Sequence, residues 1–127
     1  MYLIKVPLRV PVTKTKYFSL NLNQYRNTHF HELNKSKVKF KKIIEDQIQK
    51  LPRFNKISLT LTLYPKTKRL CDLDNVLSIV CKYTQDVIVS MDKLFDDDYT
   101  CIPEINFRFG KVLKNEPCVE ILIKEIL

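Results

Sequence analysis

The sequence predicts an α/β (α+β) fold, in which a single domain holds a mixed β-sheet with two helices packed on one face. Three observations lead to this prediction. The chain has 127 residues, a length that fits one domain. Two long segments repeat apolar residues at helical spacing, and strand-like segments lie before, between and after them. We therefore expect residues 1–127 to form one domain with the order β(β)αβαββ.

The first half of the chain predicts an edge strand and an amphipathic helix. "YLIKVPLRVPV" is apolar, and Pro7 and Pro11 within it are typical of an edge strand that runs into a loop. Residues 12–30 mix polar, basic and aromatic types, and we expect no regular element there. A helix of about 16 residues is expected from Leu33 to near Pro52. Its apolar residues at helical spacing are Leu33, Phe40, Ile44, Ile48 and Leu51.

The second half predicts a strand, a helix and a closing hairpin. "ISLTLTLY", residues 57–64, alternates apolar and polar side chains, which is the pattern of a strand with one buried face. Apolar residues from Val76 to Met91 predict a second helix, and Asp74 is expected to cap it. "EINFRFGKVL" and "CVEILIKEIL", on either side of "KNEP", predict the hairpin. Its inward-facing residues are expected to be Phe107, Phe109 and Val112, or Val119, Ile121 and Ile123.

The composition excludes several classes of protein. With one glycine, the chain has no Gly-rich phosphate-binding loop. No apolar stretch approaches the ~20 residues that span a bilayer, and the N-terminus lacks a signal-peptide core, so we expect a cytoplasmic protein without a membrane partner. The four cysteines show no CxxC spacing, which indicates free thiols. The net charge of +8 favours a polyanionic partner, most simply nucleic acid.

Acidic residues gather in one stretch of this basic chain. Seven of the fourteen are Asp72, Asp74, Asp86, Asp92, Asp96, Asp97 and Asp98. Like charges repel, so this cluster is either solvated or neutralised by a cation. In "CDLDN", Asp72 and Asp74 are two residues apart, and on an extended segment both carboxylates project from the same face. Such oxygen ligands suit Mg²⁺, which keeps open positions for phosphate oxygens.

A further carboxylate is expected from "FDDD". The intervening helix is long enough to bring the chain back antiparallel, so that Asp97 or Asp98 joins the pair. The alternative interpretation needs no metal, because Asp74 then caps the helix, Asp72 lies in a turn and the three aspartates form a solvated loop.

The motifs resemble those of a known family. "RLCDLDN", a helix and then "LFDDDYTCI" resemble the RusA family of Holliday-junction resolvases, whose motif is D-x-D-N, a helix carrying a lysine, and D-D before an apolar strand. "PVTKTKYF" resembles the family's proline-rich entry, with Thr15 where asparagine is common. "NKSKVKFKKII" resembles its first basic helix. The resemblance covers nearly the whole chain and implies a RusA-like nuclease domain.

The resemblance also implies a function. Asp72, Asp74 and Asp98 would bind Mg²⁺ or Mn²⁺, with Asp97 as the register alternative to Asp98, and no small-molecule cofactor is expected. The protein would be a homodimer with one metal site per subunit. It would hydrolyse two symmetric phosphodiester bonds of a four-way DNA junction, in DNA recombination and repair. Members of the family are often encoded by phages or prophages.

One catalytic position departs from the family pattern. Ser78 stands four residues after the second aspartate, where the family has an essential lysine. Lys82 keeps the family's K-x-x-x-D spacing with Asp86, as it would if the helix had gained about one turn. We therefore expect Lys82 either to assist catalysis or to be a solvated helix residue.

Basic residues near both motifs are expected to contact DNA. A carboxylate pair would repel the DNA backbone unless a metal ion lay between them, and Lys66, Lys68 and Arg69 beside the pair would contact phosphates. In the loop before the first helix, basic and aromatic residues are suited to unpaired bases at a junction centre. These residues are Lys14, Lys16, Tyr17 and Arg26.

Two alternatives to a junction resolvase stay open at this point. Ser78 is compatible with a DNA-binding protein that binds junctions without cutting them. A nuclease that acts on other branched or flapped DNA is equally compatible with the motifs.

Overall fold

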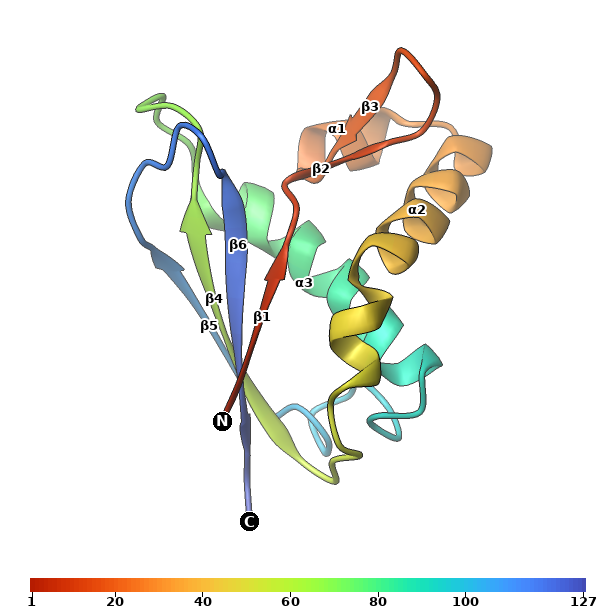
Figure 1. The fold of residues 1–127 in the computed structure, drawn as a ribbon, viewed down its shortest axis with the longest axis vertical. Helices are drawn as coiled ribbons and strands as arrows, with labels where there is room; N and C mark the ends of the chain where they lie inside the picture. Colours follow the sequence, from red (N-terminus) through yellow and green to blue (C-terminus); the bar gives the residue numbers. More distant parts are fainter.

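A computed structural model describes residues 1–127, and Figure 1 shows its arrangement. The strands are β1 (Tyr2–Val6), β2 (Arg9–Pro11), β3 (Tyr17–Ser19), β4 (Ile57–Tyr64), β5 (Glu104–Phe109) and β6 (Cys118–Glu125). The helices are α1 (Leu22–Asn27), α2 (Phe30–Gln49) and α3 (Leu73–Ser90). The main sheet has the order β1-β6-β4-β5, in which β6 is antiparallel to both neighbours and β5 is parallel to β4. The predicted α+β domain, with a mixed sheet and two packed helices, is confirmed.

The core lies between the sheet and the two long helices. On β4, every second residue from Ile57 to Leu63 is buried, and the register places Leu61 beside Ile121 of β6 on the same face. α2 covers this face with Phe40, Ile44 and Ile48. α3 covers it with Leu77, Val80 and Ile88, among others. None of the helices carries an apolar stretch of the length needed to span a bilayer.

A small hairpin and a short helix occupy the segment where no element was expected. β2 and β3 pair antiparallel, and Thr13 Oγ1 accepts a hydrogen bond from the Lys16 N–H (3.0 Å) in the turn between them. The hairpin is attached to the core by Phe18, whose ring is stacked on Tyr83 with the centroids 6.0 Å apart. Because the turn uses threonine and lysine instead of Asn-Gly, the sequence carries no strong hairpin signal there.

Both long helices begin earlier than predicted. α2 starts at Phe30, and the His29 side chain caps it by accepting from the backbone of His31. α3 starts at Leu73, so its N-cap is Asp72, and Asp74 lies inside the first turn. The prediction that Asp74 caps the helix is therefore wrong, as is the prediction that both aspartates lie on an extended segment. Leu73 is half-buried against the core, which favours the earlier start.

The predicted closing hairpin is also wrong. β5 and β6 do not pair with each other, because they lie on opposite sides of β4. β4 is the most completely buried strand, and its place between β6 and β5 keeps it away from both edges of the sheet. The connecting segment crosses the end of β4 at Gly110, where a Cβ atom would lie 2.5 Å from the Tyr64 ring.

The inward-facing residues expected of that hairpin divide between the two strands. Val119, Ile121 and Ile123 of β6 are buried as expected. On β5, Phe107 is only half-buried and Phe109 is exposed. The helices therefore do not fully cover the apolar face of β5.

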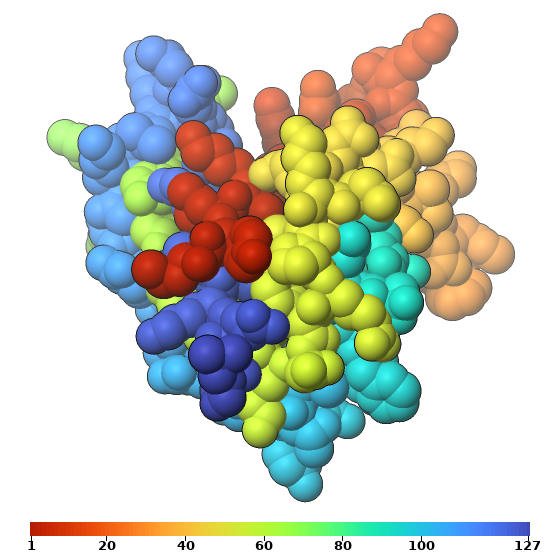
Figure 2. Space-filling model, turned by 60° about the horizontal axis from the view of Figure 1, so that its bottom comes forward, coloured from red at the N-terminus to blue at the C-terminus, as the bar shows by residue number.

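Different connecting segments form the two ends of the molecule. At one, residues 7–29, 65–74 and 110–117 come together where α2 and α3 begin (Figure 1), and we call it the cationic end. Its cations are Arg9, Lys14, Lys16, Arg26, Lys66, Lys68, Arg69, Lys111 and Lys114. The opposite end holds residues 50–56 and 91–103, and the two chain termini lie towards it. We call it the acidic end, and Figure 2 turns it forward. The name refers to its aspartates, Asp92, Asp96, Asp97 and Asp98, although the same segments also carry Lys50, Arg53, Lys56 and Lys93.

Candidate functional site

The first turn of α3 places two carboxylates at the cationic end. Asp72 is the N-cap with extended backbone (φ −77°, ψ 135°), and Asp74 is the acidic residue of the first turn. The helix dipole favours negative charge at this position. Asn75 Oδ1 accepts a hydrogen bond from the N–H of Leu22 (3.2 Å), which fixes the start of α3 against the start of α1.

Both carboxylates are exposed and have no protein partner. The Asp72 side chain makes no capping hydrogen bond. The Ser78 hydroxyl donates to the backbone carbonyl of Asp74, and its carboxylate is not involved. The only ion pair in the chain joins Arg53 and Asp92, so no nearby cation neutralises either carboxylate. The oxygens of Asp72 and Asp74 are therefore available to a ligand.

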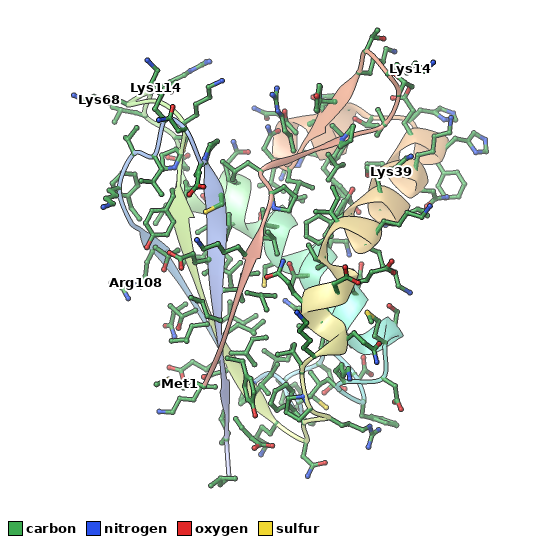
Figure 3. All side chains as sticks on the ribbon, in the orientation of Figure 1. Met1, Lys14, Lys39, Lys68, Arg108 and Lys114 are labelled. Carbon is green, nitrogen blue, oxygen red and sulfur yellow. The ribbon has the colours of Figure 1, made fainter.

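Basic residues surround this pair without contacting it. Lys66, Lys68 and Arg69 lie in the exposed loop that joins β4 to α3. In Figure 3 the side chains of Lys68 and Lys114 extend from the same tip of the molecule, although they come from different loops. All three predicted phosphate contacts thus lie on the segment that leads directly into the carboxylates.

The other predicted DNA contacts lie on the hairpin and on α1. Lys14 and Lys16 are exposed in the β2–β3 turn, and Figure 3 shows Lys14 at the tip of the second projection of this end. The Tyr17 ring is exposed, but the Arg9 guanidinium lies 4.2 Å from its centroid and covers one face. Arg26 is in the last turn of α1. The seven predicted DNA contacts therefore share the cationic end with Asp72 and Asp74.

Asp98 lies far from this pair within one chain. α3 has 18 residues and carries the chain about 27 Å away from Asp72. The carbonyl of Asp98 then accepts from the N–H of Ile102 (2.8 Å), and the neighbouring Cys101 carbonyl accepts from Ile57 at the start of β4. Asp72 follows the other end of that strand, which is about 23 Å long.

One chain therefore does not assemble the expected metal site. No group of three or more His, Cys, Asp or Glu side chains is close enough to hold a metal ion. The expectation that the helix returns the chain to Asp72 and Asp74 fails, because the next segment turns into β5, which starts beside the start of β4.

The aspartates of the acidic end have local partners. Asp98 Oδ1 accepts hydrogen bonds from the Thr100 N–H (2.9 Å) and from the Thr100 hydroxyl, and these bonds lower the pKa of Asp98. Burial raises the pKa of Asp97, and the adjacent Asp96 raises it further. Asp98 thus keeps its charge to lower pH than Asp97, and its carboxylate closes a turn.

Lys82 lies in the middle of α3. The helix runs without interruption from Leu73 to Ser90, so Lys82 is two turns, or about 12 Å, beyond Asp74 along the axis. Its side chain is exposed and makes no hydrogen bond or ion pair. The bend that would bring Lys82 to the carboxylates is absent.

Other basic residues of this end were not predicted as contacts. Arg9, Lys111 and Lys114 are far from the D-x-D motif in sequence, but the connecting segments bring them to its end of the molecule. Leu113 N–H donates to the Pro65 carbonyl (2.8 Å), and Leu20 N–H donates to the Leu8 carbonyl (2.9 Å). The sequence shows that Arg9, Lys111 and Lys114 are basic. It does not show that they lie near the D-x-D motif, because that depends on the order of the strands in the sheet.

Comparison with known proteins adds no relative to this picture. The chain matches no protein-family model, and no curated protein matches it. The likeness to the RusA family rests on the motifs quoted above.

Proposed function

We propose that this protein is a metal-dependent endodeoxyribonuclease of the RusA type that resolves four-way DNA junctions. The observation that supports this proposal best is the pair Asp72 and Asp74, which have no protein partner and lie at an end of the molecule rich in unpaired cations. Carboxylates in that position repel DNA on their own. A divalent cation removes the repulsion and binds the phosphate as well.

Each part of the site has a distinct task in the proposed reaction. Asp72 and Asp74 hold Mg²⁺ or Mn²⁺ through oxygen ligands. An ion held there would supply a water nucleophile of lowered pKa and positive charge for the leaving oxygen of the phosphodiester. Lys68 and Arg69 orient the scissile strand by holding its phosphates. The carboxylates remain ligands and form no covalent bond to the substrate.

The site needs a second copy of the chain if Asp98 is its third ligand. In a two-fold dimer each copy contributes the same surface, so an interface that brings the start of α3 in one subunit to the acidic end of the other does so twice. The partner subunit's Asp98 then lies beside Asp72 and Asp74. This arrangement produces two equivalent sites, which suits a junction with two symmetric strands to cut.

The free edge of β5 is the surface that we propose for this dimer. β5 pairs only with β4, and its residues Ile105, Phe107 and Phe109 lie on the same face as the buried Leu59, Leu61 and Leu63 of β4. Ile105 is 41% exposed and Phe109 is 56% exposed. Apolar side chains along an unpaired strand edge favour pairing with another strand.

Further exposed apolar residues lie in the loop before α3 and at the acidic end. Leu70 is 96% exposed in the loop before α3, and Phe95 and Tyr99 are 80% and 82% exposed at the acidic end. Antiparallel pairing of β5 with its copy places the Leu70 side of one subunit beside the Phe95 side of its partner. The same pairing brings Asp72 of one subunit towards the partner's Asp98, so a single interface meets both requirements.

Cleavage of a labelled four-way junction tests the proposed function. The junction and a linear duplex of the same sequence are incubated with Mg²⁺, with Mn²⁺ and with EDTA. We expect symmetric nicks in the junction alone, and only with a metal. Absence of metal-dependent cleavage of any DNA would contradict the nuclease function, and preferential cutting of flaps or forks would assign it to other branched DNA.

A non-catalytic junction-binding protein is the second candidate. It is favoured by Ser78 at the place of the family lysine and by the distance of Lys82 from the carboxylates. This candidate predicts tight junction binding in EDTA and no cleavage with either metal.

A further inference from the structure

A groove of about 410 Å³ lies at the cationic end, to one side of the carboxylate pair. Its cationic walls are Arg9 from β2, Lys66 from the loop after β4, and Lys114 from the β5–β6 loop. The remaining lining residues are Pro7, Leu8, Asn115 and Pro117, so no acidic side chain faces the groove. Three segments that are distant in sequence each contribute one positive charge.

The charges of this groove are not balanced within the protein. The chain's single ion pair is between Arg53 and Asp92 at the acidic end, so Arg9, Lys66 and Lys114 have no carboxylate partner. Cations that line one groove repel each other, and an anion bound between them relieves this repulsion. An anion bound here therefore meets three cations and breaks no ion pair within the protein.

Arg9 is already held in place for such a ligand. Its guanidinium lies over the Tyr17 ring, 4.2 Å from the centroid, which restricts its motion. A planar guanidinium donates paired hydrogen bonds that match the oxygens of a phosphate. Because the stacking orders the side chain before binding, less conformational entropy is lost when the phosphate arrives.

The groove leads towards the start of α3. Leu8 and Arg9 also line a second groove of about 210 Å³, and Cys71 and Val76 lie on the other side of that groove. Cys71 directly precedes Asp72 in the chain. The two grooves share Leu8 and Arg9, and the second one borders the residue that precedes Asp72, so a strand held beside Arg9 lies near the carboxylate pair.

We propose that the Arg9–Lys66–Lys114 groove binds the phosphodiester backbone of a nucleic acid strand beside the carboxylate site. This inference rests on the proposed function in taking nucleic acid as the partner. Arg9 and Lys114 are the new contacts, and they extend the binding surface from the loop before α3 to the β5–β6 loop. Two branches of DNA at a junction then have separate sets of cations, one in this groove and one on Lys68 and Arg69.

The test is the salt dependence of DNA binding in EDTA, where cleavage does not interfere. The groove variant is Arg9→Gln/Lys66→Gln/Lys114→Gln, and its matched control is Lys50→Gln/Lys56→Gln/Lys124→Gln, which removes the same charge from three exposed lysines near the acidic end. Affinity for a labelled four-way junction and for a labelled single strand is measured by fluorescence anisotropy between 50 and 200 mM salt.

We expect the groove variant to bind more weakly and to lose about three units from the slope of log affinity against log salt, roughly one for each phosphate contact. The control should keep the wild-type slope. The Lys66→Gln/Lys114→Gln variant leaves the Arg9–Tyr17 contact intact and should lose about two units, so a folding defect in the triple variant does not decide the result.

Several outcomes would overturn the proposed groove. If the groove variant and the control lose equal amounts of slope, net charge alone explains the effect. If the slope of the groove variant is unchanged, Arg9, Lys66 and Lys114 do not contact phosphates. Displacement of the DNA by inorganic phosphate at matched ionic strength would indicate a site for a small anion instead. Wild-type protein that binds DNA through the groove but cuts nothing with Mg²⁺ would contradict the nuclease function alone.

Discussion

The two ends of the molecule use aspartate in opposite ways. At the acidic end, Asp98 accepts two hydrogen bonds from Thr100 and Asp92 pairs with Arg53. At the cationic end, Asp72 and Asp74 are exposed and have no protein partner. Asp98 Oδ1 closes a turn and stabilises the fold, which leaves Oδ2 for a ligand, whereas both oxygens of Asp72 and of Asp74 are free of protein partners.

This difference also separates two kinds of acidic cluster. Asp96, Asp97 and Asp98 are adjacent in sequence, and the side chains of Asp96 and Asp98 accept hydrogen bonds within the local turn. Asp72 and Asp74 are fewer, but they are surrounded by cations that have no ion-pair partners. Adjacency in sequence therefore does not decide whether a carboxylate is free of protein partners in the fold.

The largest expected effect is that of Asp74→Asn. Loss of a metal ligand should lower metal-dependent cleavage by at least about 100-fold, because even indirect support of a metal ligand is worth 10–100-fold. Junction affinity in EDTA should stay the same or improve, since the substitution removes a negative charge that faces DNA. Cleavage and binding are measured side by side on the same labelled junction.

The control for that variant is Asp46→Asn, which removes an exposed carboxylate from α2, outside the proposed site. It should cut at the wild-type rate. Normal cleavage by Asp74→Asn would exclude Asp74 as a ligand and would leave the cationic end as a binding surface only.

The next effect concerns the free edge of β5. Phe109→Lys places a charge in the proposed dimer interface and should leave particles near the 15.1 kDa mass of one chain, whereas the wild type is expected to form dimers. Cleavage should fall at least about tenfold at concentrations where the variant is monomeric, because no partner subunit then supplies Asp98. Mass is measured by light scattering after size-exclusion chromatography.

Leu3→Lys provides a matched comparison on the opposite edge strand, because Leu3 and Phe109 are both 56% exposed. It should remain dimeric and active. Monomeric wild-type protein that is fully active would refute the shared site. If Leu3→Lys dissociates the dimer and Phe109→Lys does not, the interface lies at β1 and not at β5.

A small effect is expected at the acidic end from Thr100→Val. The hydrogen bonds from Thr100 lower the pKa of Asp98, so removing the hydroxyl should raise this pKa towards its ordinary value. A carboxyl group with a lowered pKa in the folded state stabilises the protein above its unfolded pKa, and the contribution is lost as the pH falls through the folded pKa. The variant's melting temperature should thus lie below that of the wild type at pH 7 and approach it near pH 2.

The pKa of Asp98 is followed by NMR titration of its side-chain carboxyl in both proteins. If the pKa of Asp98 is unchanged in Thr100→Val, the hydrogen bonds from backbone N–H groups alone lower it. A melting temperature difference that persists at pH 2 would mean that Thr100 stabilises the loop by other contacts.

Much of the fold was predictable because its strongest elements carry regular patterns. The alternation in residues 57–64 and the helical spacing from Leu33 onwards each persist for several turns or residues, so both were predicted correctly. The positions of β5 and β6 were predicted wrongly. Adjacency in sequence favours a hairpin, whereas in the structure these strands lie on opposite sides of β4. Pairing across the sheet depends on tertiary packing, which a single segment does not encode.

The candidate site was predictable only in part for a related reason. The D-x-D spacing and the neighbouring basic residues are local, and the structure keeps Asp72, Asp74, Lys68 and Arg69 at one end. The place of Asp98 depends on where the chain goes after an 18-residue helix. Helix length alone fixes how far Asp98 is carried, whereas the strand order decides whether the chain returns.

The most direct test of the account mixes two inactive variants. Asp74→Asn and Asp98→Asn are purified separately, combined in equal amounts under conditions that allow subunit exchange, and assayed on the four-way junction with Mg²⁺. If each site combines Asp72 and Asp74 of one subunit with the partner's Asp98, the mixed dimer has one intact site, and activity should recover to about one quarter of the wild-type value. If all three aspartates act within one chain, every site in the mixture remains damaged, and an inactive mixture that contains mixed dimers would contradict the shared site.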